Sequence, residues 1–300
     1  MSILHEVIAR LPFEWAQYAF MRNALVAILV ASPLFALMGT LVVNNRMAFF
    51  SDAIGHASLA GLGIGVLVGM ADPLWALLAF ALALGIAILV LQRFTRAAMD
   101  AVISLCMCFA VALGVVLLSR GGNFNRFGGY LVGDLLSITP REIGLLCLTG
   151  VLAGGGLLLG YNRILLIGFN ESLARSRGWN CWGTQVIFSA TIALVVTMNL
   201  SWVGLLLVNS LLILPAAGAQ NLAGSVRQYV LWATGISLIS GVTGLIASFY
   251  ANVATGASIV LVAMACYGAT LGWRLWRNRR GAVRSSRLTI PESGRGPRSS

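Results

Sequence analysis

Nine apolar runs, each close to the length of a membrane-spanning helix, dominate this 300-residue chain. A helix needs about 20 predominantly apolar residues to cross the hydrocarbon core of a bilayer. Strands of a membrane barrel would instead alternate polar and apolar residues. The sequence therefore predicts an all-α, polytopic transmembrane helical bundle with eight or nine spans, the lower number applying if one segment is re-entrant. The runs are 22–43, 47–70, 73–91, 99–119, 142–161, 183–199, 202–219, 229–250 and 254–273.

The composition supports a membrane protein and excludes several kinds of chemistry. Hydrophobic residues make up 59% of the chain and charged residues 10%, against about half and a quarter in soluble domains. All 20 basic residues are arginine. Without lysine the chain has neither a P-loop, which needs one to reach the nucleotide phosphates, nor a Schiff-base mechanism. The five cysteines have no C-x-x-C spacing, so they indicate neither a disulfide framework nor a zinc knuckle.

Two flanking segments differ from the predicted membrane domain, which covers residues 19–273. Residues 1–18 carry Glu6, Arg10 and Glu14 at helical spacing, which favours an interfacial helix over a signal peptide. Residues 274–300 are basic and rich in serine, glycine and proline, which predicts a disordered cytoplasmic tail. The expected surroundings are the lipid bilayer, and no nucleic-acid partner is expected.

The distribution of arginines predicts the orientation, because cytoplasmic loops carry the excess of positive charge. With nine spans and the C-terminus inside, 15 arginines fall on the cytoplasmic side and 5 on the outer side. The sequence therefore predicts an outer N-terminus and a cytoplasmic C-terminus. The outer set is Arg10, Arg22, Arg120, Arg126 and Arg141. The inner set is Arg46, Arg93, Arg96, Arg163, Arg175, Arg177, Arg227 and the eight arginines of residues 274–300.

Asp52 and His56 interrupt the second apolar run. Their spacing of four puts both side chains on one helix face, where they can meet. Counted from Arg46 at about 1.5 Å per residue, they lie roughly 9 and 15 Å along the helix. A charge near mid-bilayer costs at least about 2.5–3.5 kcal/mol. A partner, a water-filled cavity or a cation must therefore offset that cost.

The residues around this pair suggest close helix packing and ion handling. Small residues recur along the segment, which lets another helix approach closely. They are Ser51, Gly55, Ser58, Ala60, Gly61, Gly63 and Gly65. A carboxylate and an imidazole are ligands that Zn²⁺ or Mn²⁺ accept, and two copies of the chain meeting along this face would supply four. A proton relay or a purely structural hydrogen bond stays open from the residues alone.

Two loops carry polar or charged groups. The loop 120–141 holds Asp134 and falls on the predicted outer side. The phrase FNESLARSRG in the inner loop 162–182 predicts a short helix capped by Asn170 or Ser172 and ended by Gly178. That helix is either a solvated connector or a docking surface for a cytoplasmic partner.

The sixth and seventh apolar runs also contain polar groups. Asn199 lies near the end of the sixth run, and Asn209 and Ser210 lie in the seventh, ahead of Pro215. Proline removes a backbone donor and kinks or ends a helix. The segment therefore either lines a pathway or only kinks against a neighbouring helix.

Four phrases in this order resemble the membrane permease subunits of bacterial zinc/manganese ABC importers, closest to the zinc-uptake branch. They are NNRMAFFSDAIGHASLAGLGIGV, YLVGDLLSITP, FNESLARSRG and NSLLILPAAGAQNLA. The resemblance runs from about residue 33 to residue 272. The N-terminal helix and the arginine-rich tail are longer than in a minimal member, and Gly218 interrupts a usual run of small residues and threonine.

The resemblance implies a homodimeric pore in the bacterial inner membrane, served by separate ABC ATPase subunits and an extracytoplasmic metal-binding protein. It implies that Asp52 and His56 line the metal pathway, with Ser51, Asn209 and Asp134 as secondary candidates. A coupling helix that contacts the ATPase carries over to Glu171 through Gly178, including Ala174 and Arg175. The expected cargo is zinc, then manganese or iron, with no bound cofactor and no enzymatic activity in this chain.

Two other functions remain open from the residues. A proton-coupled secondary transporter would use Asp52 and His56 as a relay without any ATPase. An intramembrane hydrolase is less well supported, because no G-x-S-x-G-type phrase supplies a nucleophile for His56.

Overall fold

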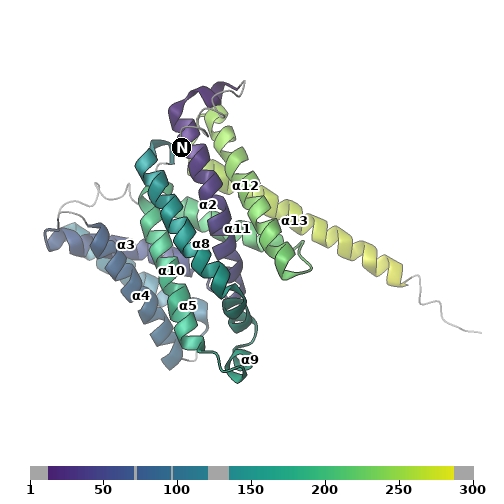
Figure 1. The fold of residues 1–300 in the computed structure, drawn as a ribbon, viewed down its shortest axis with the longest axis horizontal. Coiled ribbons are helices and arrows are strands. Elements are labelled where there is room, and N and C mark those ends of the chain that lie inside the picture. The colour runs from purple at the N-terminus through teal and green to yellow at the C-terminus, as the bar shows by residue number, and fades with distance from the viewer. Residues whose placement is uncertain (1–12, 71–72, 96, 121–134, 287–300) are drawn as a thin grey trace, which may run out of the picture.

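The computed structural model describes residues 13–70, 73–95, 97–120 and 135–286, and within these ranges the regular structure is helical. Figure 1 shows long helices packed side by side into one bundle, with the short helix α9 at one end and α13 projecting from the side. The principal helices are α2 (Ala19–Asn44), α3 (Phe50–Leu67), α4 (Leu74–Phe94), α5 (Met99–Arg120), α8 (Pro140–Phe169), α9 (Glu171–Ser176), α10 (Cys181–Val203), α11 (Leu205–Gln220), α12 (Val226–Ala251) and α13 (Thr255–Ser286). Two 3₁₀ turns, Glu14–Gln17 and Leu135–Ser137, complete the set.

The predicted fold class is confirmed. In the part of the chain that the structure describes, 8 helices are long and apolar enough to cross a membrane. The seventh predicted run, 202–219, forms α11, which has only 16 residues and is too short to count among them. The chain is thus a polytopic helical bundle in which one segment differs from the other spans.

α2 and α3 form the centre of the bundle. Within their most apolar windows, 78% of α2 and 72% of α3 is buried, against 22% for α8 and for α13. Hydrogen bonds inside this core join α2 to two other helices. The Thr40 and Tyr161 hydroxyls lie 3.0 Å apart, and the Ser237 hydroxyl donates to the Ser32 carbonyl over 3.1 Å. Such bonds between helices are worth about 0.6 kcal/mol each, so apolar packing remains the main source of cohesion.

The break that defines α11 falls at Gly204. This residue has φ 81° and ends α10 while starting α11. Left-handed backbone of this kind favours glycine, which has no Cβ to clash. Pro215, by contrast, lies inside α11, and the helix continues past it to Gln220. Of the two expected effects of Pro215, ending the helix does not occur, and the discontinuity lies eleven residues earlier.

The small residues of α3 are used for packing within the chain. A Cβ at Gly61 would meet the backbone of Leu77 on α4, and one at Gly63 would meet Leu117 on α5. A Cβ at Gly55 would meet the side chain of Leu205 on α11. These glycines point to different neighbours, so they do not form the single free face along which two copies were expected to meet.

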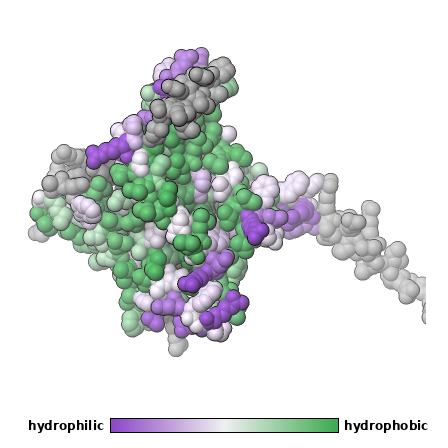
Figure 2. Space-filling model, in the orientation of Figure 1, coloured by the Kyte–Doolittle hydropathy of each residue, from purple (hydrophilic) through white to green (hydrophobic). Residues whose placement is uncertain are grey.

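The outside of the bundle has the polarity expected in a bilayer. Figure 2 shows a broad apolar surface with hydrophilic side chains toward both ends and along the projecting part of α13. Apolar side chains on the peripheral helices are strongly exposed, for example Leu159 at 91% and Phe94 at 84%. An apolar exterior of this extent is stable only against lipid or another protein.

Both flanking segments are only partly described. The predicted interfacial helix at residues 1–18 is seen from residue 13, where a 3₁₀ turn precedes α2; residues 1–12 lie outside the described ranges. At the other end α13 continues to Ser286, so the helix extends past the boundary predicted at residue 273. Residues 287–300 of the predicted tail lie outside the described ranges.

The contact between α2 and α11 depends on Gly39, where a Cβ would overlap the Leu212 carbonyl. We expect Gly39→Ala to force the helices apart and destabilise the protein by about 1–3 kcal/mol, the usual cost of overpacking. The loss should appear as a lower melting temperature of the detergent-solubilised protein.

Gly155→Ala is the matched control, because nothing lies within 4 Å of a Cβ at Gly155 on α8. This substitution should leave the melting temperature unchanged or raise it slightly, since alanine favours helix. Equal melting temperatures for the two variants would contradict the proposed contact.

Candidate functional site

Asp52 and His56 lie in the first two turns of α3 and meet as their spacing predicts. His56 Nε2 is 3.7 Å from Asp52 Oδ1. Each side chain is 32% exposed, so neither is sealed in the core. The distance exceeds that of a good hydrogen bond, which leaves the facing lone pairs available to a third group.

Asn209 provides that third group from a distant part of the chain. Its Nδ2 donates to Asp52 Oδ1 over 2.7 Å, across 157 positions of sequence. The amide oxygen of Asn209 is buried and has no hydrogen-bond partner among the described residues. A buried acceptor without a partner normally costs about 1–3 kcal/mol. The site therefore holds an unused oxygen next to a carboxylate and an imidazole.

These three side chains line a cavity of about 740 Å³. Its walls come from the start of α3, the first three turns of α11, the turn at Leu135 and Leu136, and the link between α12 and α13. Most of the lining is apolar, with Ser210 and Thr255 as further polar contributors. Irregular backbone at membrane depth is tolerated where it lines such a cavity. The break at Gly204 directly precedes Leu205, which lines this cavity.

The cavity explains how an apolar run can contain two ionisable residues. Asp52 and His56 face an open space that is large enough for water, and Asn209 hydrogen-bonds the carboxylate. The cost of a charge in a membrane falls when it faces a water-filled cavity or pairs with a polar group. Of the three possible compensations, the structure supplies a cavity and a partner.

One chain offers an incomplete set of metal ligands. Within the described ranges, no group of three or more His, Cys, Asp or Glu side chains comes together. The polar groups of this site are one carboxylate, one imidazole and the Asn209 amide, whose oxygen is buried. Closed zinc sites usually have four ligands, so this arrangement suits transient contact with a cation better than permanent storage.

The other predicted pathway residues are placed differently. Ser51 is fully buried, and it is not among the residues that line the cavity. Its neighbour Asp52 points elsewhere because successive residues of a helix diverge by about 100°. Asp134 lies outside the described residues. Sequence reasoning missed Thr255 and the α12–α13 link, which carry no charge or motif that could have indicated them.

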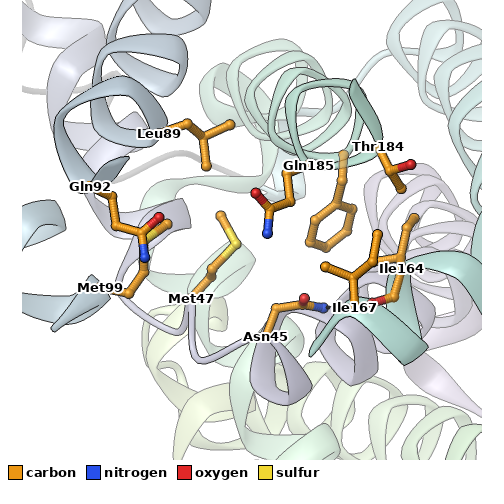
Figure 3. Close-up of a pocket in the computed structure, with 10 residues that line it drawn as sticks. Asn45, Met47, Leu89, Gln92, Met99, Ile164, Ile167, Thr184 and Gln185 are labelled. Carbon is orange, nitrogen blue, oxygen red and sulfur yellow. Dashed lines mark hydrogen bonds between the residues drawn. The ribbon is translucent and has the colours of Figure 1, made fainter. Parts of the chain in front are cut away.

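A second, smaller hollow lies at the base of α3. Its volume is about 80 Å³, and it opens between the α2–α3 link, the beginnings of α5 and α10 and the ends of α4 and α8. Figure 3 shows the amides of Asn45, Gln92 and Gln185 and the thioethers of Met47 and Met99 around it. It shares no lining residue with the larger cavity.

The short helix α9 forms as predicted. Asn170 caps it by accepting from the Leu173 amide over 3.0 Å, and Gly178 follows it with φ 74°. Glu171 and Arg175 pair across one turn at 2.6 Å. Both are exposed, so the pair contributes little to stability.

One face of α9 is buried against neighbouring residues and another face is exposed. Ala174 is fully buried in a small cluster with Ile167 and Cys181. Leu173 is 44% exposed and Phe169, at the end of α8, is 72% exposed. α9 thus presents apolar side chains outward from a fixed base.

The chain matches the ABC 3 transport family over residues 17–271 and belongs to it. The resemblance deduced from the four sequence phrases is thereby confirmed at the level of the family. The protein is the multi-pass membrane component of an ABC transporter and not an enzyme. A carrier that works without an ATPase is inconsistent with this family.

Individual relatives cover most of the chain. It is 30% identical over 239 residues to the high-affinity zinc uptake system membrane protein ZnuB of Haemophilus influenzae, covering 79% of this chain and 91% of the relative. It is 27% identical over 247 residues to the manganese transport system membrane protein MntC of Listeria monocytogenes, covering 82% and 88%. These values do not separate zinc from manganese as the cargo.

A solved structure supports the fold. PsaBC from Streptococcus pneumoniae, in complex with a Fab, superposes with a TM-score of 0.72. The match covers 90% of this chain and 95% of the other, at 23% sequence identity. The helical arrangement is thus shared by a chain whose sequence has diverged widely.

Proposed function

We propose that this chain is the permease of a bacterial ABC importer for a divalent metal ion, with zinc as the main cargo. The observation that carries the proposal is the convergence of Asp52, His56 and Asn209 on one open cavity. The relatives named for zinc and for manganese uptake support the metal. In this proposal the ion passes the three side chains on its way through the membrane.

These ligands favour passage of the metal ion over its tight binding. Conduction requires binding that is strong enough to draw the ion in and weak enough to release it. One carboxylate and one imidazole give partial replacement of the hydration shell, and the Asn209 oxygen can add a neutral ligand. A second copy of the chain, as in a homodimer, would bring a second set of donors to the pathway. Zinc accepts mixed nitrogen and oxygen ligands of this kind, and manganese or iron is the lesser candidate.

Two partners follow from an ABC permease without its own nucleotide site. A cytoplasmic ATPase would dock on α9, where Leu173 and Phe169 are exposed beside the buried Ala174. Force applied there reaches α10 directly, since α9 ends a few residues before α10 begins. A metal-binding protein outside the membrane would deliver the ion to the cavity.

Asp52→Asn and His56→Ala should each reduce zinc uptake at least about tenfold, because each removes one of two ionisable ligands. The measurement is uptake of radioactive zinc by cells without their own zinc and manganese importers, supplied with the full transporter. Asp100→Asn is the control, since Asp100 is exposed at the start of α5 and away from the cavity. Normal uptake by both site variants, in complexes that assemble, would refute the pathway.

Asn209→Leu should impair uptake while leaving the protein folded, because it removes the hydrogen bond to Asp52 and the unused oxygen together. Asn199→Leu is the matched control. Asn199 is also buried in a membrane helix, but its amide donates only to the Val195 carbonyl. Equal zinc uptake by the two leucine variants, measured at equal expression, would show that Asn209 has no part in the pathway.

Leu173→Asp should weaken binding of the ATPase by placing a charge on the exposed apolar face of α9. Ser172→Asp adds the same charge to the same helix at a polar, exposed position, and should be tolerated. The comparison is made by co-purification of the ATPase and by zinc-dependent ATP hydrolysis. Loss of ATPase from both variants, or from neither, would contradict docking through Leu173.

A further inference from the structure

The last part of α13 extends beyond the segment that the family shares. The family match ends at residue 271, whereas α13 runs without interruption to Ser286. We call residues 272–286 the basic extension. The basic extension therefore lies outside the segment that the family match covers.

The basic extension combines positive charge with exposed tryptophan. Its sequence, GWRLWRNRRGAVRSS, contains five arginines and no acidic residue. Trp273 and Trp276 are 53% and 45% exposed, and their ring centroids lie 5.2 Å apart. Tryptophan concentrates where hydrocarbon meets headgroups, and arginine binds phosphate through its planar guanidinium. The two residue types thus match two adjacent layers of a membrane surface.

Two hydrogen bonds hold the start of the basic extension against the residue that follows α11. Arg274 Nη1 donates to Asn221 Oδ1 over 3.2 Å, and Asn221 Nδ2 donates to Thr270 Oγ1 over 3.3 Å. Asn221 directly follows α11, at the end that the arginine count assigns to the cytoplasm. The extension therefore begins level with the cytoplasmic ends of the spans.

The direction of α13 separates the basic extension from α9. Figure 1 shows α13 leaving the side of the bundle, while α9 lies at its lower end. The basic extension continues along the axis of α13, so it leaves the bundle away from the end that α9 occupies. An ATPase centred on α9 would instead be reached by a helix running toward that end.

We propose that the basic extension binds the phosphate headgroups of anionic phospholipids in the cytoplasmic leaflet. Trp273 and Trp276 lie at the boundary of the hydrocarbon, and Arg277 and Arg279 reach the headgroups beyond it. Charge complementarity is the basis for this choice, since the cytoplasmic leaflet carries the anionic lipid that attracts basic juxtamembrane segments. The binding anchors the end of α13 and does not depend on which metal the transporter carries.

The test compares phosphatidylglycerol with phosphatidylcholine on the purified full-length protein, using native mass spectrometry to count retained lipids. Each basic side chain near an anionic surface contributes about 1 kcal/mol, or about fivefold in affinity. The double variant Arg277→Gln/Arg279→Gln should therefore bind phosphatidylglycerol about 25-fold more weakly than wild type. Raised salt should weaken wild-type binding, because exposed charges are screened.

The control is Arg141→Gln, which removes a positive charge from an exposed position at the start of α8, on the predicted outer side. It should retain phosphatidylglycerol as wild type does, and phosphatidylcholine should be retained weakly by all three proteins. Equal retention of phosphatidylglycerol by the extension variant and wild type would overturn the proposal. So would equal retention of the two lipids, or an extension variant that keeps its lipid but loses the ATPase, which would identify a protein-docking surface.

Discussion

The hydrogen bond from Asn209 to Asp52 holds together the two halves of the site. Asp52 belongs to the central helix α3 and Asn209 to the short helix α11, and the donor–acceptor distance of 2.7 Å is that of a charge-assisted bond. Without it the carboxylate would face the cavity with only His56 beside it. The break at Gly204 matters for the same reason, because it starts α11 at Leu205 and puts Asn209 about one turn from that first residue.

α3 packs closely against its neighbours along one part of its length and borders the cavity along another. Gly61 and Gly63 bring α4 and α5 against the outer half of α3. In its first half, Asp52 and His56 line the cavity, whereas Phe50, Ala53 and Ile54 are fully buried. One helix thus combines close packing with two side chains that border open space. Such a helix can carry ionisable groups at membrane depth while its other end stays fixed.

The sequence predicted the spans, the meeting of Asp52 with His56 and the capped helix at Glu171, because each depends on local periodicity or spacing. It did not predict that α11 would be short, since Gly204 stands inside an apolar run without any polar signal. The contact between Asn209 and Asp52 joins residues 157 positions apart, and no local pattern encodes it. The small residues of α3 were misread as one face because their partners lie on three different helices.

α11 is bonded at both ends. Asn209, near its beginning, hydrogen-bonds Asp52, and Asn221, just past its end, hydrogen-bonds Thr270 and Arg274 of α13. Sixteen helical residues form a stiff rod about 24 Å long, and a rod held in this way cannot shift at one end alone. The position of α13 is therefore linked, through α11, to the geometry around the Asp52 carboxylate. A contact that holds the end of α13 in place also constrains the site.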